Sequence, residues 1–315
     1  MQALISGASG LVGGSLVKAL RASGDVAVRL VRRREAAAAP GAAWWNPAAG
    51  ELDASALTTA DAVIHLAGEN VAGGRWSESR KARIRSSRVA GTRLIAEALA
   101  SEAARRRAEH PGAELPMLLC ASAIGYYGDR GEALVNEASS PGEGFLAEVC
   151  QAWEEAAAPA REAGLRVVHL RIGVVLSPEG GALAKMLPPF RLGLGGPLGS
   201  GRQFMSWITV ADLVGVIRHA LAEDTLVGPL NAVAPQPVTQ GEMARVLGQV
   251  LGRPAIVPTP AFALRLALGE MADEMLLAST RVDAGRLLAS GYTFEHPELL
   301  GALNHLLADD SSASS

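Results

Sequence analysis

The chain has 315 residues, of which 49% are hydrophobic and 19% charged, and its formal net charge is −3 at pH 7. A chain of this length and hydrophobic content can bury a large core, and it fits one α/β domain with a smaller domain attached. The charge offers no basic field for nucleic acid. No apolar run approaches the ~18 residues that span a bilayer, and the first expected strand begins at about Gln2, which leaves no room for a signal peptide. We therefore expect a cytoplasmic protein with no nucleic-acid and no membrane partner.

The first 34 residues combine an apolar run, three spaced glycines and an amphipathic helix expected over 11–23. Glycine is needed where a strand turns sharply into a helix, and again where the backbone approaches a pyrophosphate. The free N–H groups at the helix start would face the phosphates. The pattern predicts a dinucleotide-binding loop rather than a plain structural turn. Its contacts are assigned to Gly7, Ala8, Ser9, Gly10, Leu11, Val12 and Gly13.

The end of the second expected strand, 26–31, indicates which nucleotide is bound. An acidic residue there would accept from a ribose hydroxyl, whereas arginine accommodates a 2′-phosphate. Three arginines follow this strand, and no acidic residue lies between the strand and Glu35. The sequence therefore favours NADP(H), with Arg32 and Arg33 as the phosphate contacts. The alternative is a solvated basic turn.

Further apolar runs at 62–66, 117–121 and 167–172 alternate with helical periodicity over 77–104 and 144–163. Such near-continuous apolar strands predict a parallel sheet covered on both faces. The Ala/Pro/Gly-rich segment 34–57 is expected to be an irregular crossover, and 188–201 a long loop of the kind that forms lids. Further helices are expected at 211–222, 239–251, 260–277 and 296–307, before a disordered tail at 308–315.

Some polar residues have a structural interpretation that is as good as a functional one. Cys120 and Cys150 lack a CxxC spacing, so they are interpreted as small core residues, with no disulfide and no metal site. His65 and His169 lie within strands and are interpreted as core histidines. Asp212 is expected to cap the helix that follows it.

Several motifs together carry a resemblance that covers nearly all of the chain. They are Gly7-x-x-Gly10-x-x-Gly13, His65-Leu-Ala-Gly68-Glu-Asn70, Ser87-Arg-Val-Ala-Gly-Thr92, Ala121-Ser-Ala-Ile-Gly-Tyr-Tyr-Gly128, Trp153-Glu154, Leu170-Arg-Ile-Gly-Val-Val-Leu176 and Ser206-Trp-Ile-Thr-Val-Ala-Asp212. The chain resembles the extended short-chain dehydrogenase/reductase family, in its epimerase/dehydratase-like branch with a C-terminal domain of unknown function. The resemblance implies a doubly wound parallel (Rossmann) α/β sheet with a smaller C-terminal α/β substrate domain. The NADP-binding domain would comprise 1–175 and 207–232, and the substrate-side domain 176–206 and 233–307.

The resemblance also implies further cofactor contacts. Leu66, Ala67 and Gly68 would pass beside the adenosine, and Gly173 and Val174 would contact the nicotinamide carboxamide through backbone groups.

Arg88 stands where many family members carry asparagine, and it shares the apolar stripe of its helix. A buried guanidinium needs a partner. That partner would be a cofactor phosphate or ribose, or alternatively Glu69, Glu137 or backbone carbonyls. Arg83, on the same helix, is a weaker candidate for the cofactor.

The family's catalysis uses a Ser or Thr, a Tyr, and a Lys four residues after the Tyr. The matching helix here has Phe145 and Val149, so the usual proton relay is absent from its place. Ser122 and Tyr127 are the substitutes we assign as catalytic, with Ser122 also near the cofactor. Tyr126 is the alternative phenol, Glu137 matches a family glutamate, and for each of these loop packing or helix capping is the competing interpretation.

Other polar residues complete the prediction. Neither Lys81 nor Lys185 replaces the missing lysine by position, whereas Arg202, Gln203 and Trp207 would face a polar substrate if 188–201 is a lid. The sequence thus predicts an NADP(H)-dependent oxidoreductase or epimerase-like enzyme acting on a small polar substrate. A catalytically silent NADP(H)-binding sensor or scaffold is the alternative. The family analogy adds a possible homodimer.

Overall fold

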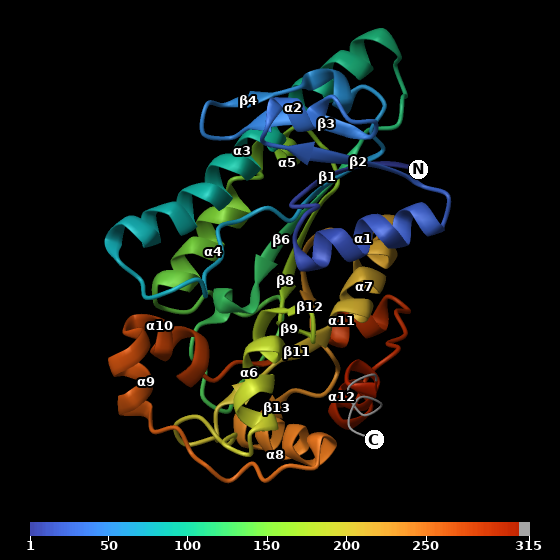
Figure 1. Ribbon diagram of the computed structural model, residues 1–315. Helices are drawn as coiled ribbons and strands as arrows, with labels where there is room; N and C mark the ends of the chain where they lie inside the picture. Colours follow the sequence, from blue (N-terminus) through green and yellow to red (C-terminus); the bar gives the residue numbers. More distant parts are fainter. Residues whose placement is uncertain (309–315) are drawn as a thin grey trace.

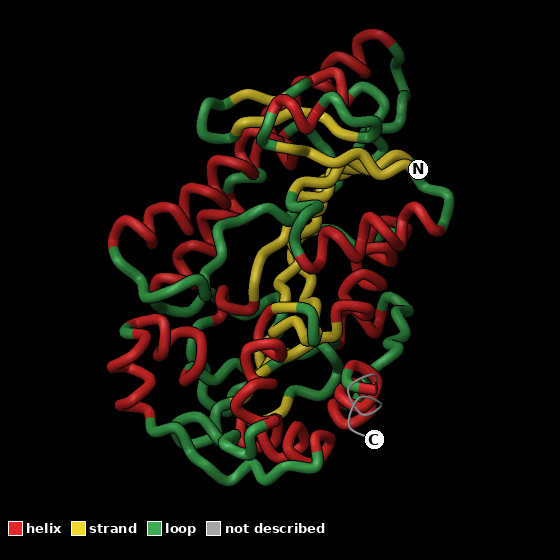
Figure 2. The backbone as a smooth tube through the Cα atoms, viewed as in Figure 1, coloured by secondary structure: helices red, strands yellow, loops and turns green. Residues whose placement is uncertain are grey.

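The computed structural model describes residues 1–308, which build a mostly parallel eight-stranded sheet with helices on both faces (Figures 1 and 2). The strand order is β12-β8-β6-β5-β1-β2-β3-β4, and only β3 and β4 pair antiparallel. The bounds are β1 (Gln2–Ser6), β2 (Val26–Val31), β3 (Ala42–Asn46), β4 (Glu51–Leu52), β5 (Ala62–His65), β6 (Met117–Ala123), β8 (Val167–Ile172) and β12 (Gly228–Ala232). The order reverses between β1 and β5, which is the switch point where doubly wound sheets bind ligands.

Both faces of this sheet are buried, which explains its near-continuous apolar strands. In β1, Ala3 and Ile5 join one core cluster with α1 (Leu11–Ala22) and α7 (Val210–Ala222). Leu4 faces the other cluster, with α3 (Glu78–Glu109) and the segment between α4 (Phe145–Glu155) and α5 (Ala158–Glu162). Each apolar residue of β1 therefore has a helix layer to pack against.

A smaller set of elements lies beyond the carboxyl ends of the strands (Figure 1). Its core packs α6, α8 and α12 together. Its bounds are β7 (Leu134–Val135), β9 (Val174–Ser177), α6 (Gly181–Arg191), β10 (Phe204–Met205), β11 (Trp207–Thr209), β13 (Val238–Thr239), α8 (Gln240–Leu251), α9 (Ala261–Leu268), α10 (Glu270–Ala272), a π-helical turn η3 (Asp273–Leu277), β14 (Arg281–Val282), α11 (Gly285–Ala289) and α12 (Leu299–Leu306). The short elements of the larger part are α2 (Arg34–Ala37), η1 (Ala54–Leu57) and η2 (Ile124–Tyr127). No helix within residues 1–308 has the length and apolar character needed to cross a membrane.

The predicted strands at the start of the chain and at 26–31, 62–66, 117–121 and 167–172 are confirmed to within two residues at either end. The irregular crossover expected over 34–57 is wrong in part, because it contains β3 and β4. Strand β3 pairs in parallel with β2 and buries Ala43 and Trp45 in the core. Burial of these side chains outweighs the weak strand propensity of an alanine-rich segment.

The long irregular loop expected from Pro188 begins later, because α6 continues through Pro188 and Pro189 to Arg191. Both prolines are exposed, whereas Leu187 and Phe190 are buried on the opposite side. Packing of that apolar face holds the helix although proline removes two of its hydrogen bonds. The helices expected over 144–163 and 260–277 are each divided into shorter pieces. Of the predicted tail, 309–315 lies outside the described residues.

Candidate nucleotide-binding site

The glycine-rich loop joins β1 to α1 at the switch point, and its glycines have different roles. Gly7 has a φ of +73°, and a Cβ there would lie 2.8 Å from the backbone N of Ala67. A Cβ on Gly13 would lie only 2.2 Å from the carbonyl oxygen of Gly7. A Cβ on Gly10 would meet one carbonyl at 3.3 Å, so the fold itself tolerates more there. Gly10 therefore leaves space on the side of the loop that faces away from the protein.

Helix α1 begins directly at this loop. Gly10 is its N-cap residue, and the first turn holds no acidic side chain. The first N–H groups of a helix have no intrahelical partner, and they carry the positive end of the dipole. An anionic pyrophosphate fits this uncovered helix start.

Two of the three arginines after β2 are free to bind a ligand. The guanidinium of Arg34 lies 3.9 Å from the centre of the Trp44 ring and 4.0 Å from a Glu51 carboxylate oxygen. Arg32 and Arg33 are exposed, and neither guanidinium has a hydrogen-bond or ion-pair partner among residues 1–308. Because β2 pairs in parallel with β1, they lie at the same sheet edge as the glycine loop.

The segment after β5 lies against the glycine loop. The backbone N–H of Ala67 donates to the Ser6 hydroxyl at 3.3 Å, and that hydroxyl also pairs with Nδ1 of His65 at 2.5 Å. His65 is fully buried, and burial together with the charge of Arg88 lowers its pKa to about 3. His65 is therefore a neutral core residue that fixes the position of the Leu66–Gly68 backbone.

Arg88 is half-buried beside this segment. Its Nη1 donates to the carbonyls of Glu69 and Ile84 at 3.0 and 3.1 Å, and its guanidinium lies 5.0 Å from the centre of the Trp153 ring. Burial lowers the pKa of Arg88. The structure thus supplies the backbone-carbonyl partners that were one of the alternatives, and the other N–H groups make no hydrogen bond within residues 1–308. Arg83 is exposed on the same helix.

Gly173 and Val174 follow β8 at the same edge of the sheet. Their N–H groups donate to the carbonyls of Ala232 and Ser206, at 3.1 and 2.9 Å. Both backbone N–H groups are therefore already engaged within the fold, and the predicted contact with the carboxamide stays a prediction.

The two hydroxyls predicted to be catalytic lie in a buried polar network. Ser122 donates to Glu154 at 2.7 Å, and Glu154 forms two hydrogen bonds of 2.9 Å with Arg171. The Tyr127 hydroxyl donates to Asn231 at 2.6 Å and accepts from Arg171 at 3.1 Å. Tyr127 is 0% exposed, and burial raises its pKa to about 12. The catalytic assignment stays a prediction, and this geometry weighs against it.

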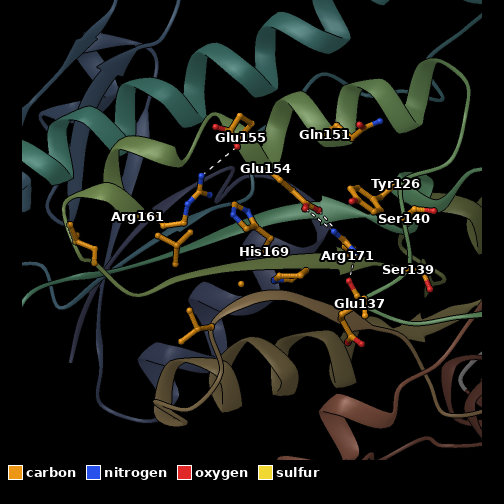
Figure 3. Close-up of a pocket in the computed structure, with 16 residues that line it drawn as sticks. Tyr126, Glu137, Ser139, Ser140, Gln151, Glu154, Glu155, Arg161, His169 and Arg171 are labelled. Carbon is orange, nitrogen blue, oxygen red and sulfur yellow. Dashed lines mark hydrogen bonds and ion pairs between the residues drawn. The ribbon is translucent and has the colours of Figure 1, made fainter.

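The same network forms one wall of a cavity of about 560 Å³ between β8, α4, α5 and the start of β12 (Figure 3). The side chains of His169 and Arg171 face it from β8, and the ring of Tyr126 lies 3.5 Å from the Arg171 guanidinium. Glu137 also lines it, while one of its carboxylate oxygens accepts from the backbone N–H of Asn231 at 2.8 Å. Tyr126 and Glu137 are thus tied into the fold here. The residues that line this cavity include none of the glycine loop.

Helix α4 begins with Phe145, whose ring packs against Trp76 at a centroid distance of 5.1 Å. The ammonium of Lys81 lies 5.2 Å from the centre of the same ring, and it pairs with Glu270. This ion pair raises the pKa of Lys81. Val149, one turn along α4, is buried. Neither Phe145 nor Val149 can donate a proton.

Two acidic residues near this helix start were missed from the sequence. The Glu274 carboxylate accepts from the backbone N–H groups of Phe145 and Leu146 at 2.8 and 2.7 Å, and so caps α4 from η3. Glu270 reaches α3 through Lys81. These contacts span well over a hundred residues of sequence, and no local pattern signals them.

Two of three predictions for the smaller part of the molecule are corrected. Trp207 is 0% exposed and donates to the Gln236 carbonyl, so it cannot face a substrate. Gln203 is buried and holds the loop through the carbonyls of Leu198 and Leu276. Arg202 alone of the three is exposed.

The N-cap of α7 is Thr209 rather than Asp212. The Thr209 hydroxyl accepts from the Asp212 N–H at 3.0 Å. The Asp212 carboxylate instead accepts from the N–H groups of Glu295 and His296, which fixes the loop before α12. Asp212 therefore joins two distant segments.

The two cysteines are buried and unpaired within the described chain. Burial raises the pKa of Cys150 to about 12, and that of Cys120 also rises. Both are core thiols, as predicted. No group of three or more metal-ligating side chains is assembled within residues 1–308.

The doubly wound sheet, its glycine loop at the switch point and the smaller part beyond the strand ends define an α/β protein of the nucleotide-binding class. The chain matches the NAD dependent epimerase/dehydratase family over residues 3–231, and it belongs to that family. Residues 259–306 match a domain of unknown function, DUF1731.

Proteins similar to this one over nearly its whole length agree with the family match. An epimerase family protein of Mycobacterium bovis is 43% identical over 96% of both chains. The human epimerase family protein SDR39U1, solved with NADPH, superimposes with a TM-score of 0.84 at 34% identity, over 98% of this chain and 100% of that one. A nucleoside-diphosphate sugar epimerase from Corynebacterium glutamicum gives a TM-score of 0.76 at 34% identity, over 99% of this chain and 60% of that one. The extended short-chain dehydrogenase/reductase fold predicted from the motifs is thereby confirmed.

Proposed function

We propose that the protein is an NADP(H)-dependent oxidoreductase or epimerase-like enzyme that acts on a small polar substrate beyond the strand ends. One observation carries the proposal: two unpaired arginines lie at the end of β2, beside a glycine loop with an uncovered helix start. A 2′-phosphate is the group that arginine at this place accommodates. The NADPH in the structure of human SDR39U1 supports the choice of cofactor.

We assign the predicted cofactor contacts as follows. Gly7–Gly13 would hold the pyrophosphate, Arg32 and Arg33 the 2′-phosphate, and Leu66–Gly68 the adenosine, with Arg88 and the weaker candidate Arg83 beside them. Ser122, Gly173 and Val174 complete the predicted set. When bound, NADP(H) supplies hydride transfer, and the protein has to position the substrate and exclude competing reactions.

The proton for such a reaction needs a donor other than the family's tyrosine. Phe145 and Val149 stand in place of the relay, and Tyr127 is enclosed by Asn231 and Arg171. A water molecule beside the bound cofactor is therefore the donor that we propose. Ser122 is turned to Glu154, where it holds the Arg171 pair in place.

The cofactor proposal is tested by parallel titration of NADPH and NADH. Replacing Arg32 and Arg33 by alanine removes the charge-assisted bonds to the 2′-phosphate, so NADPH binding should weaken at least about tenfold more than NADH binding. Arg34→Ala is the matched control, because Arg34 is held by Trp44 and Glu51. Equal weakening for both nucleotides would contradict the assignment.

The enzymatic part needs a separate measurement. NADPH consumption by the purified protein should be detected with at least one member of a broad carbonyl panel. Tight NADPH binding without turnover on any member would leave the silent binding protein as the better description.

A further inference from the structure

The cavity beside β8 contains one buried side chain that the fold does not use. His169 is 5% exposed, and its ring faces the cavity (Figure 3). Neither ring nitrogen has a hydrogen-bond partner within residues 1–308, whereas His65 pairs with the Ser6 hydroxyl. Nδ1 of His169 is covered by the protein, which leaves Nε2 as the atom that a ligand reaches. A buried polar group without a partner costs folding free energy, so its presence indicates a role other than packing.

The position of His169 in β8 explains why its ring borders the cavity. Successive side chains of a strand point to opposite faces of the sheet. Val168 and Leu170 fill the core cluster on one face, so His169 and Arg171 share the other. The adjacent wall is formed by 227–229, at the start of the edge strand β12. The sheet therefore holds His169 at the floor of a cavity near its edge.

The charges beside His169 balance one another. On one side Arg171 forms two hydrogen bonds of 2.9 Å with Glu154, and on the other Arg161 pairs with Glu155 at 3.4 Å (Figure 3). Burial lowers the pKa of His169, and the two carboxylates and two guanidiniums act on it in opposite directions. The imidazole is therefore neutral at neutral pH. Its Nε2 either donates or accepts, depending on the tautomer.

Two further polar atoms on the lining residues have no hydrogen-bond partner within the described chain. They are the hydroxyl of Tyr126 and the second carboxylate oxygen of Glu137, whose first oxygen accepts from Asn231. Leu165 and Pro229 add apolar surface to the same cavity. The volume of about 560 Å³ lies within the range of ~300–1,000 Å³ that is typical of small-molecule sites. The cavity thus offers separate hydrogen-bonding positions around an apolar patch.

This arrangement disfavours a charged ligand. An anion at His169 would face two carboxylates, and a cation would face two guanidiniums, while all four groups are already paired. The unpaired carboxylate of Glu137 lies beyond Arg171, which donates to its backbone carbonyl at 3.3 Å (Figure 3). A cation there would also lie near a guanidinium. A hydroxyl suits every one of these positions, because it both donates and accepts.

We propose that this cavity is a second small-molecule site, which binds a neutral polyol through a hydroxyl on Nε2 of His169. Further hydroxyls of the ligand bond to Glu137 and Tyr126, and its carbon skeleton packs on Leu165 and Pro229. The lining residues include none of the glycine loop, of 32–33 or of 66–68. The polyol and the nucleotide therefore occupy different places, and the proposal stands apart from the proposed function.

The test uses three probes that share one hydroxylated six-carbon skeleton. Sorbitol is neutral, gluconate carries a carboxylate, and glucamine carries an ammonium. Each is titrated into the full chain labelled with ring-¹⁵N histidine, and the imidazole signals are followed by NMR. Sorbitol should shift the His169 signal to saturation and leave that of the exposed His110 unchanged. Gluconate and glucamine should each bind at least about tenfold more weakly, equivalent to ~1.4 kcal/mol.

Two variants test the position of the site. His169→Leu removes both nitrogens at a similar side-chain volume, and it should weaken sorbitol binding, measured by saturation-transfer NMR, at least about tenfold. Gln151→Trp keeps His169 but places a bulky ring at the cavity wall from an exposed helix position, and it should weaken binding as well. His110→Leu is the matched control and should bind sorbitol as the wild type does. A thermal melt checks that each variant is folded.

Four results would overturn the proposal. The first is a His169 signal that does not respond to sorbitol, and the second is a charged probe that binds as tightly as sorbitol. The third is unchanged sorbitol binding in both His169→Leu and Gln151→Trp. The fourth is displacement of sorbitol by saturating NADPH, which would place the probe in the nucleotide site. A protein that fails to bind NADPH would still give a valid sorbitol titration, so the two proposals fail separately.

Discussion

Substitution of single glycines separates what the fold needs from what the ligand needs. A Cβ at position 13 would stand 2.2 Å from the Gly7 carbonyl oxygen, so Gly13→Ala must displace α1 from the loop. We expect this variant to lose about 1–3 kcal/mol of unfolding free energy, as overpacked sites do. Gly10→Ala meets only one atom at 3.3 Å, and it should cost about 0.5–1 kcal/mol, mainly because alanine is a poorer N-cap.

NADPH affinity should rank the glycine variants differently from their unfolding free energy. The side chain of Gly10→Ala would occupy the space left for the pyrophosphate, so NADPH affinity should fall at least about tenfold, equivalent to ~1.4 kcal/mol. Gly14→Ala is the control, since its nearest atom is at 3.7 Å and alanine favours a helix interior by about 0.5–1 kcal/mol. The assays are urea unfolding and titration of NADPH fluorescence. If Gly10→Ala binds NADPH as well as Gly14→Ala does, the loop does not hold the pyrophosphate.

Three further predictions concern the contacts of Glu274, Tyr127 and His65. Glu274→Ala removes the carboxylate cap of α4 and should lower the free energy of unfolding in urea by about 1–2 kcal/mol. The control is Glu298→Ala, which should change this free energy little, because the Glu298 side chain makes no capping hydrogen bond. Equal losses in the two variants would refute the cap. Tyr127→Phe leaves Asn231 without its donor and should cost about 1–2 kcal/mol with NADPH affinity unchanged; a stability equal to that of the wild type would contradict the network. Burial lowers the pKa of His65 from its ordinary 6.5 to about 3 in the folded protein. The unfolded chain therefore takes up the proton first, and the free energy of unfolding should fall as the pH drops from 6.5 toward 3. Urea unfolding across that range should show a weaker pH dependence in His65→Asn, and an unchanged pH dependence would refute the assignment.

The sequence predicted the parts of the fold that have a local signal. Strands β1, β2, β5, β6 and β8 are continuous apolar runs because helices cover both faces, and the glycine spacing marks the loop between β1 and α1. Strand β3 was missed because its signal is weak without its pairing to β2. Helix α6 was not predicted, because Pro188 and Pro189 disfavour a helix locally, although buried neighbours sustain it.

In the candidate site too, the residues marked by a local pattern could be predicted, and the contacts between distant segments could not. Arg32 and Arg33 could be chosen over Arg34 by their nearness to the strand, and the stacking of Arg34 on Trp44 supplies a physical reason. The capping of α4 by Glu274 could not be predicted, because it joins segments far apart in sequence.

The central claim is that this chain binds NADP(H) through the 2′-phosphate. The most direct test is calorimetric titration of the wild-type protein with NADPH and NADH under identical conditions. The account predicts that NADPH binds at least about tenfold more tightly, in line with two charge-assisted contacts to one phosphate. Equal affinities, or tighter binding of NADH, would contradict it.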